Sequence, residues 1–141
     1  NPNDGLIFDE EAKNEIFEEL EKDWCSGITF SGGDPLYLGN REEVSSLVSE
    51  IRSKFKDKSI WCYTGYTWEE IMKDMATDSN LKKIIDNIDV LLDGRFMLHL
   101  ANEKIQYVGS SNQRIIDVKK SLNSNEINLY IDNSNILKGE V

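Results

Sequence analysis

The sequence predicts an α/β fold with a mostly parallel sheet. Short runs of β-branched and aromatic residues alternate with segments whose apolar residues recur at helical spacing. The most apolar run, IDVLLDG at residues 88–94, is typical of a strand that is covered on both faces. This alternation indicates βαβ units with parallel strands and right-handed crossovers. A length of 141 residues favours a single domain over residues 1–141.

The chain is expected to open with a helix and then a strand. Asp9 is placed to cap the helix, and Glu10 and Glu11 would lie in its electropositive first turn. A strand is expected at residues 27–30, where the sequence reads GITF. The apolar residues expected on one face of the helix are Ala12, Ile16, Phe17, Leu20 and Trp24.

The next pair of elements contains the clearest amphipathic helix. Asn40, with Glu43 three residues later, has the pattern of a helix-capping signal. A second strand is expected at residues 58–65, KSIWCYTG, because the run is rich in aromatic and branched residues. The apolar residues that follow the cap at helical spacing are Val44, Leu47, Val48, Ile51 and Phe55.

The second half of the chain repeats this pattern. Thr67 and Glu70 form another capping box, which opens a helix to about Met75 that the segment at 80–87 extends or restarts. The third strand follows at 88–94, and INLYID at 127–132 is expected to be a last strand. The tail at 123–141 is rich in Asn and Ser, so it is expected to be either a terminal strand or poorly ordered.

Composition limits the kinds of partner that the protein is expected to bind and the compartment in which it is expected to occur. The net charge of −10 argues against nucleic acid, whose phosphates require clustered Lys and Arg. No apolar run reaches the ~20 residues of a membrane span, so no membrane partner is expected. The lone histidine, His99, excludes a site built from several histidines. Cys25 and Cys62 form neither a CxxC motif nor a disulfide framework, which favours the reducing cytoplasm.

Glycine and polar residues gather where the expected strands end. In parallel α/β folds, ligands bind at the carboxyl ends of the strands. Any one of these segments alone is more typical of a turn, but four on one rim indicate a ligand site. No phosphate-binding loop, nucleophile–histidine set or His/Cys metal site fits the sequence. The four segments are 31–34, 63–66, 93–96 and 109–114.

Four motifs together resemble a known family. GITFSGGDPL, DKSIWCYTGYTWEE, VLLDGRF and GSSNQRIIDV occur in the order and at the spacing found in activating proteins of anaerobic (class III) ribonucleoside-triphosphate reductases. The similarity extends over about residues 5–122. These proteins are small radical S-adenosylmethionine enzymes, so the resemblance implies a partial (βα) barrel with a mostly parallel sheet.

The resemblance also implies a reaction and its partners. One electron from a [4Fe–4S] cluster cleaves S-adenosylmethionine to methionine and a 5′-deoxyadenosyl radical. The radical takes a hydrogen atom from a glycine of the large reductase subunit and leaves a glycyl radical there. The expected partners are that large subunit and an electron donor such as flavodoxin or ferredoxin.

Family roles can be placed on matching positions of this sequence. The resemblance assigns Asp93 to the ribose hydroxyls and Arg95 to the methionyl carboxylate. It assigns Asn112 to the rim, near the adenosyl group or the incoming glycine loop. The motif for the methionyl amino group corresponds to Ser31, Gly32, Gly33 and Asp34, and the pocket floor to Tyr63, Thr64 and Gly65. No catalytic residue and no metal ligand is assigned within the chain.

The sequence departs from the family at the cluster. The family holds its cluster through three cysteines spaced CxxxCxxC, and Cys25 and Cys62 cannot replace them. The resemblance therefore implies ligands upstream of Asn1, in a fragment lacking roughly 30 N-terminal residues and the first strand of the sheet. Such a chain alone would be inactive. A natural variant without a cluster, an activase of the pyruvate formate-lyase type, and a cluster-less protein-binding domain remain as alternatives.

Overall fold

The computed structural model describes residues 10–105 and 107–130. One four-stranded sheet has the order β1 (Gly27–Phe30), β2 (Ser59–Tyr63), β3 (Val90–Asp93) and β4 (Arg114–Asp117). The first three strands are parallel, and β4 is antiparallel to β3. The predicted α/β class and mostly parallel sheet are therefore confirmed. Over the described residues the sheet is open, so the partial barrel is not confirmed.

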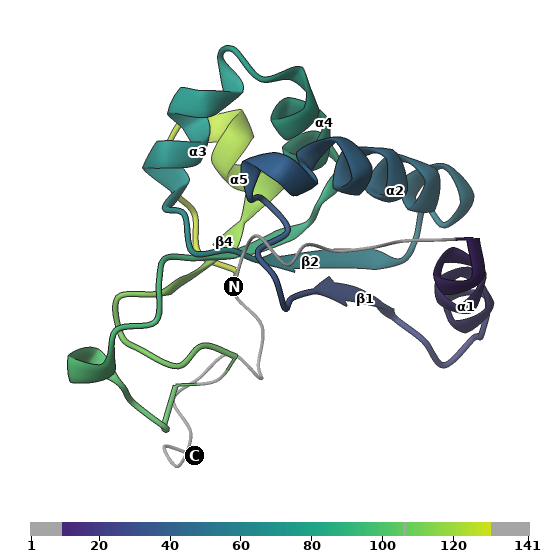
Figure 1. Cartoon of the computed structure of the whole chain (residues 1–141). Coiled ribbons are helices and arrows are strands. Elements are labelled where there is room, and N and C mark those ends of the chain that lie inside the picture. The colour runs from purple at the N-terminus through teal and green to yellow at the C-terminus, as the bar shows by residue number, and fades with distance from the viewer. Residues whose placement is uncertain (1–9, 106, 131–141) are drawn as a thin grey trace.

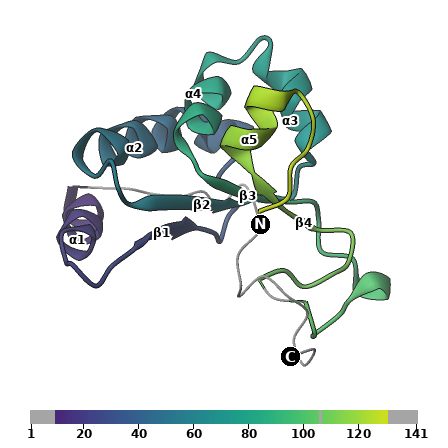
Figure 2. The same cartoon turned by 180° about the vertical axis from the view of Figure 1, so that it is seen from behind.

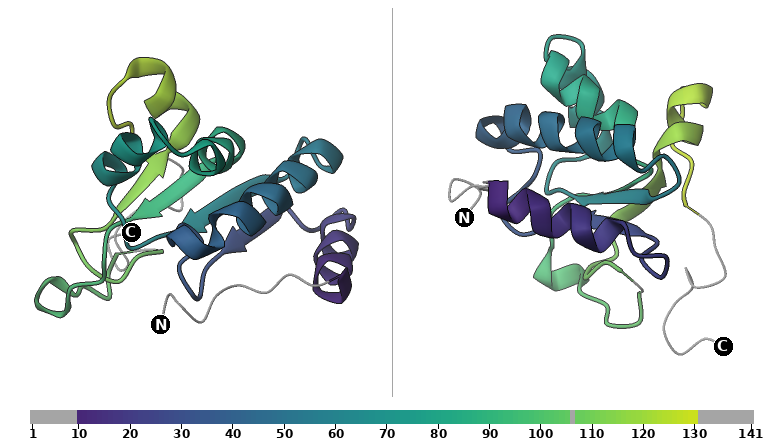
Figure 3. Two further views of the ribbon diagram at one scale, coloured as in Figure 1. Left: turned by 45° about the horizontal axis from the view of Figure 1, so that its top comes forward. Right: turned by 90° about the vertical axis from the view of Figure 1, so that its right-hand side faces the viewer.

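Most of the helices cover one face of the sheet. They are α2 (Arg41–Lys54), α3 (Trp68–Met75), α4 (Ser79–Asn87) and α5 (Val118–Ser124) (Figures 1 and 2). The remaining helix, α1 (Glu10–Leu20), lies beside the edge of the sheet formed by β1 (Figure 3). Two short 3₁₀ turns, η2 (Leu38–Asn40) and η3 (Leu98–Leu100), lie in the connections. Within the described ranges, no helix combines the length and apolarity needed to cross a membrane.

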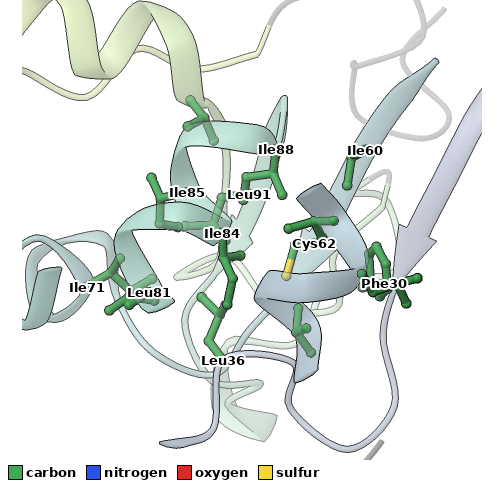
Figure 4. Close-up of a cluster of buried hydrophobic side chains, with 14 of the residues drawn as sticks. Phe30, Leu36, Ile60, Cys62, Ile71, Leu81, Ile84, Ile85, Ile88 and Leu91 are labelled. Carbon is green, nitrogen blue, oxygen red and sulfur yellow. The ribbon is translucent and has the colours of Figure 1, made fainter. Parts of the chain in front are cut away.

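The main core lies between the sheet and this layer of helices. Ile60 and Cys62 of β2 and Leu91 of β3 point into it (Figure 4). A smaller apolar cluster covers the opposite face, where Val90 and Leu92 pack with Val108 and Ile115. All four residues of β3 are consequently buried, as its apolar sequence predicts. The helical residues of the main core include Leu47, Val48, Ile51, Ile71, Leu81, Ile84 and Ile85.

The starts of α3, α4 and α5 follow local capping chemistry, and at α5 the Asp117 carboxylate accepts from Lys120 N over 3.0 Å. At α3 the Thr67 hydroxyl accepts from the backbone N–H of Glu70, and the Glu70 carboxylate accepts from the N–H of Thr67, which confirms the capping box. The Asp78 carboxylate accepts from Leu81 N over 3.0 Å, so α4 restarts as a separate helix. The predicted cap at Asp9 lies outside the described residues.

Two predictions about side chains near helix ends are wrong. Asn40 does not cap α2 with its side chain, because its Nδ2 is turned back to donate to the carbonyl oxygen of Asp34 over 2.8 Å. Trp24 does not share the buried face of α1, because the helix ends at Leu20 and the chain turns. The Trp24 side chain is 73% exposed, with Lys22 Nζ 5.3 Å from its ring centroid.

The predicted last strand is not formed within the described residues. Residues 127–130 contain only an isolated antiparallel bridge between Ile116 and Leu129, and residues 131–132 lie outside the described range. The backbone still pairs with β4, since Asp117 N donates to the Asn128 carbonyl oxygen and Tyr130 N to the Ile115 carbonyl oxygen, while Asn128 Nδ2 donates to the Ser124 hydroxyl of α5 over 2.7 Å. The segment therefore follows β4 but is held to the neighbouring helix.

Candidate functional site

The polar segments meet at one edge of the sheet. The carboxyl ends of β1, β2 and β3 lie there because the three strands are parallel. The fourth segment, 109–113, comes before β4, and its position at the same edge follows from the antiparallel direction of β4. A pocket of about 290 Å³ opens between the four segments. Its lining residues are Gly32, Asp34, Tyr63, Thr64, Gly65, Gly94, Arg95, Phe96 and Gln113.

Asp34 joins the ends of β1 and β2. Its Oδ1 accepts from the Thr64 hydroxyl and from the backbone N–H of Leu36, each over 2.9 Å. Its Oδ2 accepts from the backbone N–H of Gly65 over 2.8 Å. One carboxylate therefore fixes the geometry of two strand ends while lining the pocket. Of the other residues in its segment, Gly32 lines the pocket with a φ of +85°, and Ser31 and Gly33 lie beside it.

Gly65 lies between the side chains of Asp34 and Arg95, which approach it closely. A Cβ at this position would lie 3.3 Å from Cγ of Arg95 and 3.5 Å from Oδ2 of Asp34. The Arg95 side chain is exposed, and no ion pair joins it to another part of the described chain. The pocket lining thus contains the carboxylate of Asp34 and the side chain of Arg95, whose guanidinium forms no ion pair with the described residues. Such a pair suits a ligand that carries both an ammonium and a carboxylate group.

Asp93 lies at the same edge but faces protein donors. Its side chain is 1% exposed, and it accepts from Arg114 Nε over 3.1 Å, from Arg114 Nη2 over 2.6 Å and from Trp68 N over 2.7 Å. Arg114 also pairs with Glu69 over 2.7 Å. The hydrogen bonds that Arg114 donates to Asp93 and then to Glu69 raise the pKa of Arg114, and the bond from Arg114 lowers the pKa of the Glu69 carboxyl. The ribose contact expected of Asp93 stays a prediction.

A second pocket of about 480 Å³ adjoins the first and shares Gly65, Gly94 and Arg95 with it. Asn112 lines this pocket, and its Nδ2 donates to the backbone oxygen of Arg95 over 2.8 Å. The Asn112 Oδ1 atom is buried and has no hydrogen-bond partner among the described residues. It is therefore an acceptor with free capacity in a residue that lines the larger pocket.

Gln113 holds the loop before β4 in place, and sequence reasoning missed it. Its Oε1 accepts from the backbone N–H of Gly109 over 2.9 Å and of Ser110 over 3.0 Å. Its Nε2 donates over 3.0 Å to the carbonyl oxygen of Gly94, a residue with a φ of +92°. The polar run at 109–114 indicated this region. Nothing in the run distinguished Gln113 from Asn112 or showed that Arg114 would form a buried pair.

Tyr63, at the end of β2, contacts Tyr107 on the face of the sheet opposite the main core. Its hydroxyl donates to the carbonyl oxygen of Tyr107, a non-glycine residue with a φ of +73°. Burial, and then the neighbouring Tyr107, raises the pKa of Tyr63, so its hydroxyl stays protonated at neutral pH. Tyr63 therefore serves here as a donor that positions one wall of the pocket.

The described residues do not fit an iron–sulfur cluster. They contain no group of three or more His, Cys, Asp and Glu side chains able to hold a metal ion. Cys62 is buried in the core, and burial raises the pKa of its thiol well above the ordinary value, whereas a cluster ligand must be a thiolate. The Cys25 thiol donates to the carbonyl oxygen of Gly27 over 3.4 Å, next to α1. Neither cysteine lines the two pockets.

Comparisons with known proteins agree with the motifs. The family model described as a 4Fe-4S single cluster domain matches residues 1–116. A protein of Enterobacteria phage T4 is 36% identical over 115 residues, which cover 82% of this chain and 68% of the phage protein. Relatives from Haemophilus influenzae and Escherichia coli K12 are each 34% identical over 113 residues, covering 79% of this chain and 69% and 70% of theirs.

All three relatives are named anaerobic ribonucleoside-triphosphate reductase-activating protein. The comparison with solved structures finds no significant match. The level of identity and the share of both chains that is covered show the family directly. The chain belongs to the family of anaerobic ribonucleoside-triphosphate reductase-activating proteins.

Proposed function

We propose that this protein activates an anaerobic ribonucleotide reductase and that the pocket at the sheet edge binds S-adenosylmethionine. The overall reaction is reductive cleavage of S-adenosylmethionine to methionine and a 5′-deoxyadenosyl radical. That radical takes a hydrogen atom from a glycine of the large reductase subunit, giving 5′-deoxyadenosine and a glycyl radical. The observation that carries the proposal is the placement of Asp34 and Arg95 on either side of Gly65.

The charges of the pocket match the methionyl end of this ligand. The ammonium group would lie toward Asp34 and the backbone of Gly32 and Gly33, and the carboxylate would pair with Arg95. Three hydrogen bonds hold the Asp34 carboxylate at the ends of β1 and β2, and Arg95 follows β3 at the same edge of the sheet. Thr64 and Tyr63 line the floor of the pocket. Thr64 holds Asp34 through its hydroxyl, and Tyr63 positions one wall of the pocket through its bond to Tyr107.

The adjoining pocket is the proposed place of the adenosyl group. Asn112 Oδ1 is a buried acceptor with no partner in the described part of the chain, so it can accept from a ribose hydroxyl or the adenine amino group. Asp93 remains the other proposed ribose acceptor. Because its oxygens receive bonds from Arg114 and Trp68, a ribose hydroxyl would have to share or displace one of these donors.

The cleavage needs one electron, which a [4Fe–4S] cluster supplies when it is bound, and flavodoxin or ferredoxin is the proposed source. No described residues fit that cluster, so this chain's residues are assigned to binding and orienting S-adenosylmethionine and to excluding water. The proposed setting is the cytoplasm, where Cys25 and Cys62 remain reduced.

Calorimetric titration of the full-length protein with S-adenosylmethionine tests the proposal. Arg95→Ala should weaken binding at least about tenfold, because a charge-assisted bond to the carboxylate is lost. The control is Lys83→Ala, which removes an exposed cation on α4, away from both pockets. Equal affinities for the wild type and both variants would show that this pocket does not bind S-adenosylmethionine.

A further inference from the structure

We propose that the exposed apolar segment Phe96, Met97 and Leu98 is the surface on which the reductase polypeptide docks. This inference rests on the proposed function, since it names the surface used by that function's protein target. The three side chains are 56%, 41% and 80% exposed, respectively. Three consecutive large apolar residues left this open to water are a common mark of a protein-binding surface.

The segment forms the outer lip of the candidate site. Phe96 lines the smaller pocket, and Met97 lines the larger one. Leu98 begins η3, the short turn that projects from the connection between β3 and β4, seen at the lower left of Figure 1. A polypeptide that presents a residue to the pockets would therefore pass over these side chains.

The backbone holds this lip in one conformation. Met97 N donates to the Ser110 hydroxyl over 3.2 Å, and Ser111 N donates to the carbonyl oxygen of Leu100 over 2.9 Å. Ala101 and Ser110 also form an antiparallel bridge. A surface held in advance loses little conformational entropy on binding.

The Phe96 ring also packs against this frame. A Cβ added at Gly109 would lie 2.9 Å from Cδ1 of Phe96, so the ring rests directly on the backbone of the loop before β4. Gln113 ties the same loop to Gly94 through its Nε2. The apolar side chains are thus presented by a hydrogen-bonded frame that also builds the pocket wall.

The occupant that fits is a polypeptide with apolar side chains. The relatives are named for activating a reductase, which is itself a protein, so their target must reach the site as a folded chain or a loop. Protein interfaces draw most of their affinity from a few apolar or aromatic anchors beside polar contacts. Here Arg95 supplies a charged neighbour to the three apolar side chains.

Binding of the purified large reductase subunit to the full-length protein tests the surface. Leu98→Ser should weaken this binding at least about tenfold, because Leu98 is an exposed anchor that lines neither pocket. The matched control is Leu38→Ser, since Leu38 is 68% exposed on η2 and also lies outside both pockets. Unchanged binding with Leu98→Ser, or an equal loss with Leu38→Ser, would overturn the proposal.

Two further measurements separate this proposal from the proposed function. S-adenosylmethionine affinity should be the same in the wild type and Leu98→Ser. If the wild type fails to bind S-adenosylmethionine but its binding to the reductase still depends on Leu98, the docking surface stands and the proposed cofactor is wrong. If Leu98→Ser instead abolishes self-association seen by sedimentation and leaves reductase binding unchanged, a second copy of this chain occupies the surface and the proposal is overturned.

Discussion

The carboxylate of Asp93, at the end of β3, receives two hydrogen bonds from the guanidinium of Arg114, at the start of β4. These residues are also partners in the antiparallel register of the two strands. The same carboxylate accepts from the backbone N–H of Trp68 at the start of α3. One buried charge therefore connects two strands and a helix at the edge where the pockets lie.

Removing Arg114 should be costly because the Asp93 charge would remain buried without its main partner. Arg114→Met is expected to lower the free energy of unfolding by about 3 kcal/mol, measured by urea denaturation. Glu69→Gln is the control, since it removes only the exposed partner of Arg114 and should cost less than about 1 kcal/mol. Similar losses in the two variants would show that the Asp93 charge does not depend on Arg114.

Adding a side chain at Gly65 should block the ligand without unfolding the protein. Gly65→Val places a side chain between Asp34 and Arg95, and it should weaken S-adenosylmethionine binding at least about tenfold by calorimetry. Gly39→Val is the matched control, because a Cβ there meets a flexible side chain, Tyr37, at a similar 3.2 Å. Comparable melting temperatures with unequal affinities are expected, and equal affinities would contradict the placement of the ligand.

The stability of the fold should fall in acid partly through Asp89. Burial alone would raise the pKa of this carboxyl, but bonds from Ile60 N, Arg52 and Lys119 outweigh burial and lower it below its ordinary value. A lowered pKa in the folded state means that the stabilisation is complete above about pH 5 and is lost as the pH falls through about 4 and below.

The stability difference between the wild type and Asp89→Asn tests this pH dependence. Urea denaturation should show a constant difference from about pH 7 to pH 5 that shrinks as the pH falls below about 4. Asp86→Asn is the control, because Asp86 forms only an exposed pair with Lys82. A difference for Asp89→Asn that does not change with pH would contradict the proposed charge interactions.

Local sequence patterns predicted most of the helices and parallel strands. The Thr67–Glu70 box and the apolar repeat from Val44 to Ile51 concern residues only a few positions apart, and both are confirmed. The predictions of a cap at Asn40 and of a buried Trp24 were wrong for local reasons too. The sequence was equally compatible with a bond from Asn40 to a loop carbonyl and with a helix that ends before Trp24. The antiparallel direction of β4 depends on a distant partner, β3, and no local pattern shows it.

The candidate site likewise contains contacts that the sequence predicts and contacts that it does not. Parallel strands bring their carboxyl ends together, so the meeting of Asp34, Gly65 and Arg95 could be anticipated. The pairing of Asp93 with Arg114 joins residues 21 positions apart, and it depends on which way the Asp93 side chain points from a short strand. The bond from Gln113 to Gly94 spans 19 positions and depends equally on the folded loop. Such contacts follow from the tertiary structure and are not visible in any motif.

The most direct test measures 5′-deoxyadenosine after the reduced, full-length protein is incubated anaerobically with S-adenosylmethionine and the large reductase subunit. The wild type and Lys83→Ala should form 5′-deoxyadenosine together with a glycyl radical detected by electron paramagnetic resonance. Arg95→Ala should lose both products to a similar extent, because the ligand is no longer held beside Asp34. A glycyl radical that forms without S-adenosylmethionine, or full product formation by Arg95→Ala, would contradict the account.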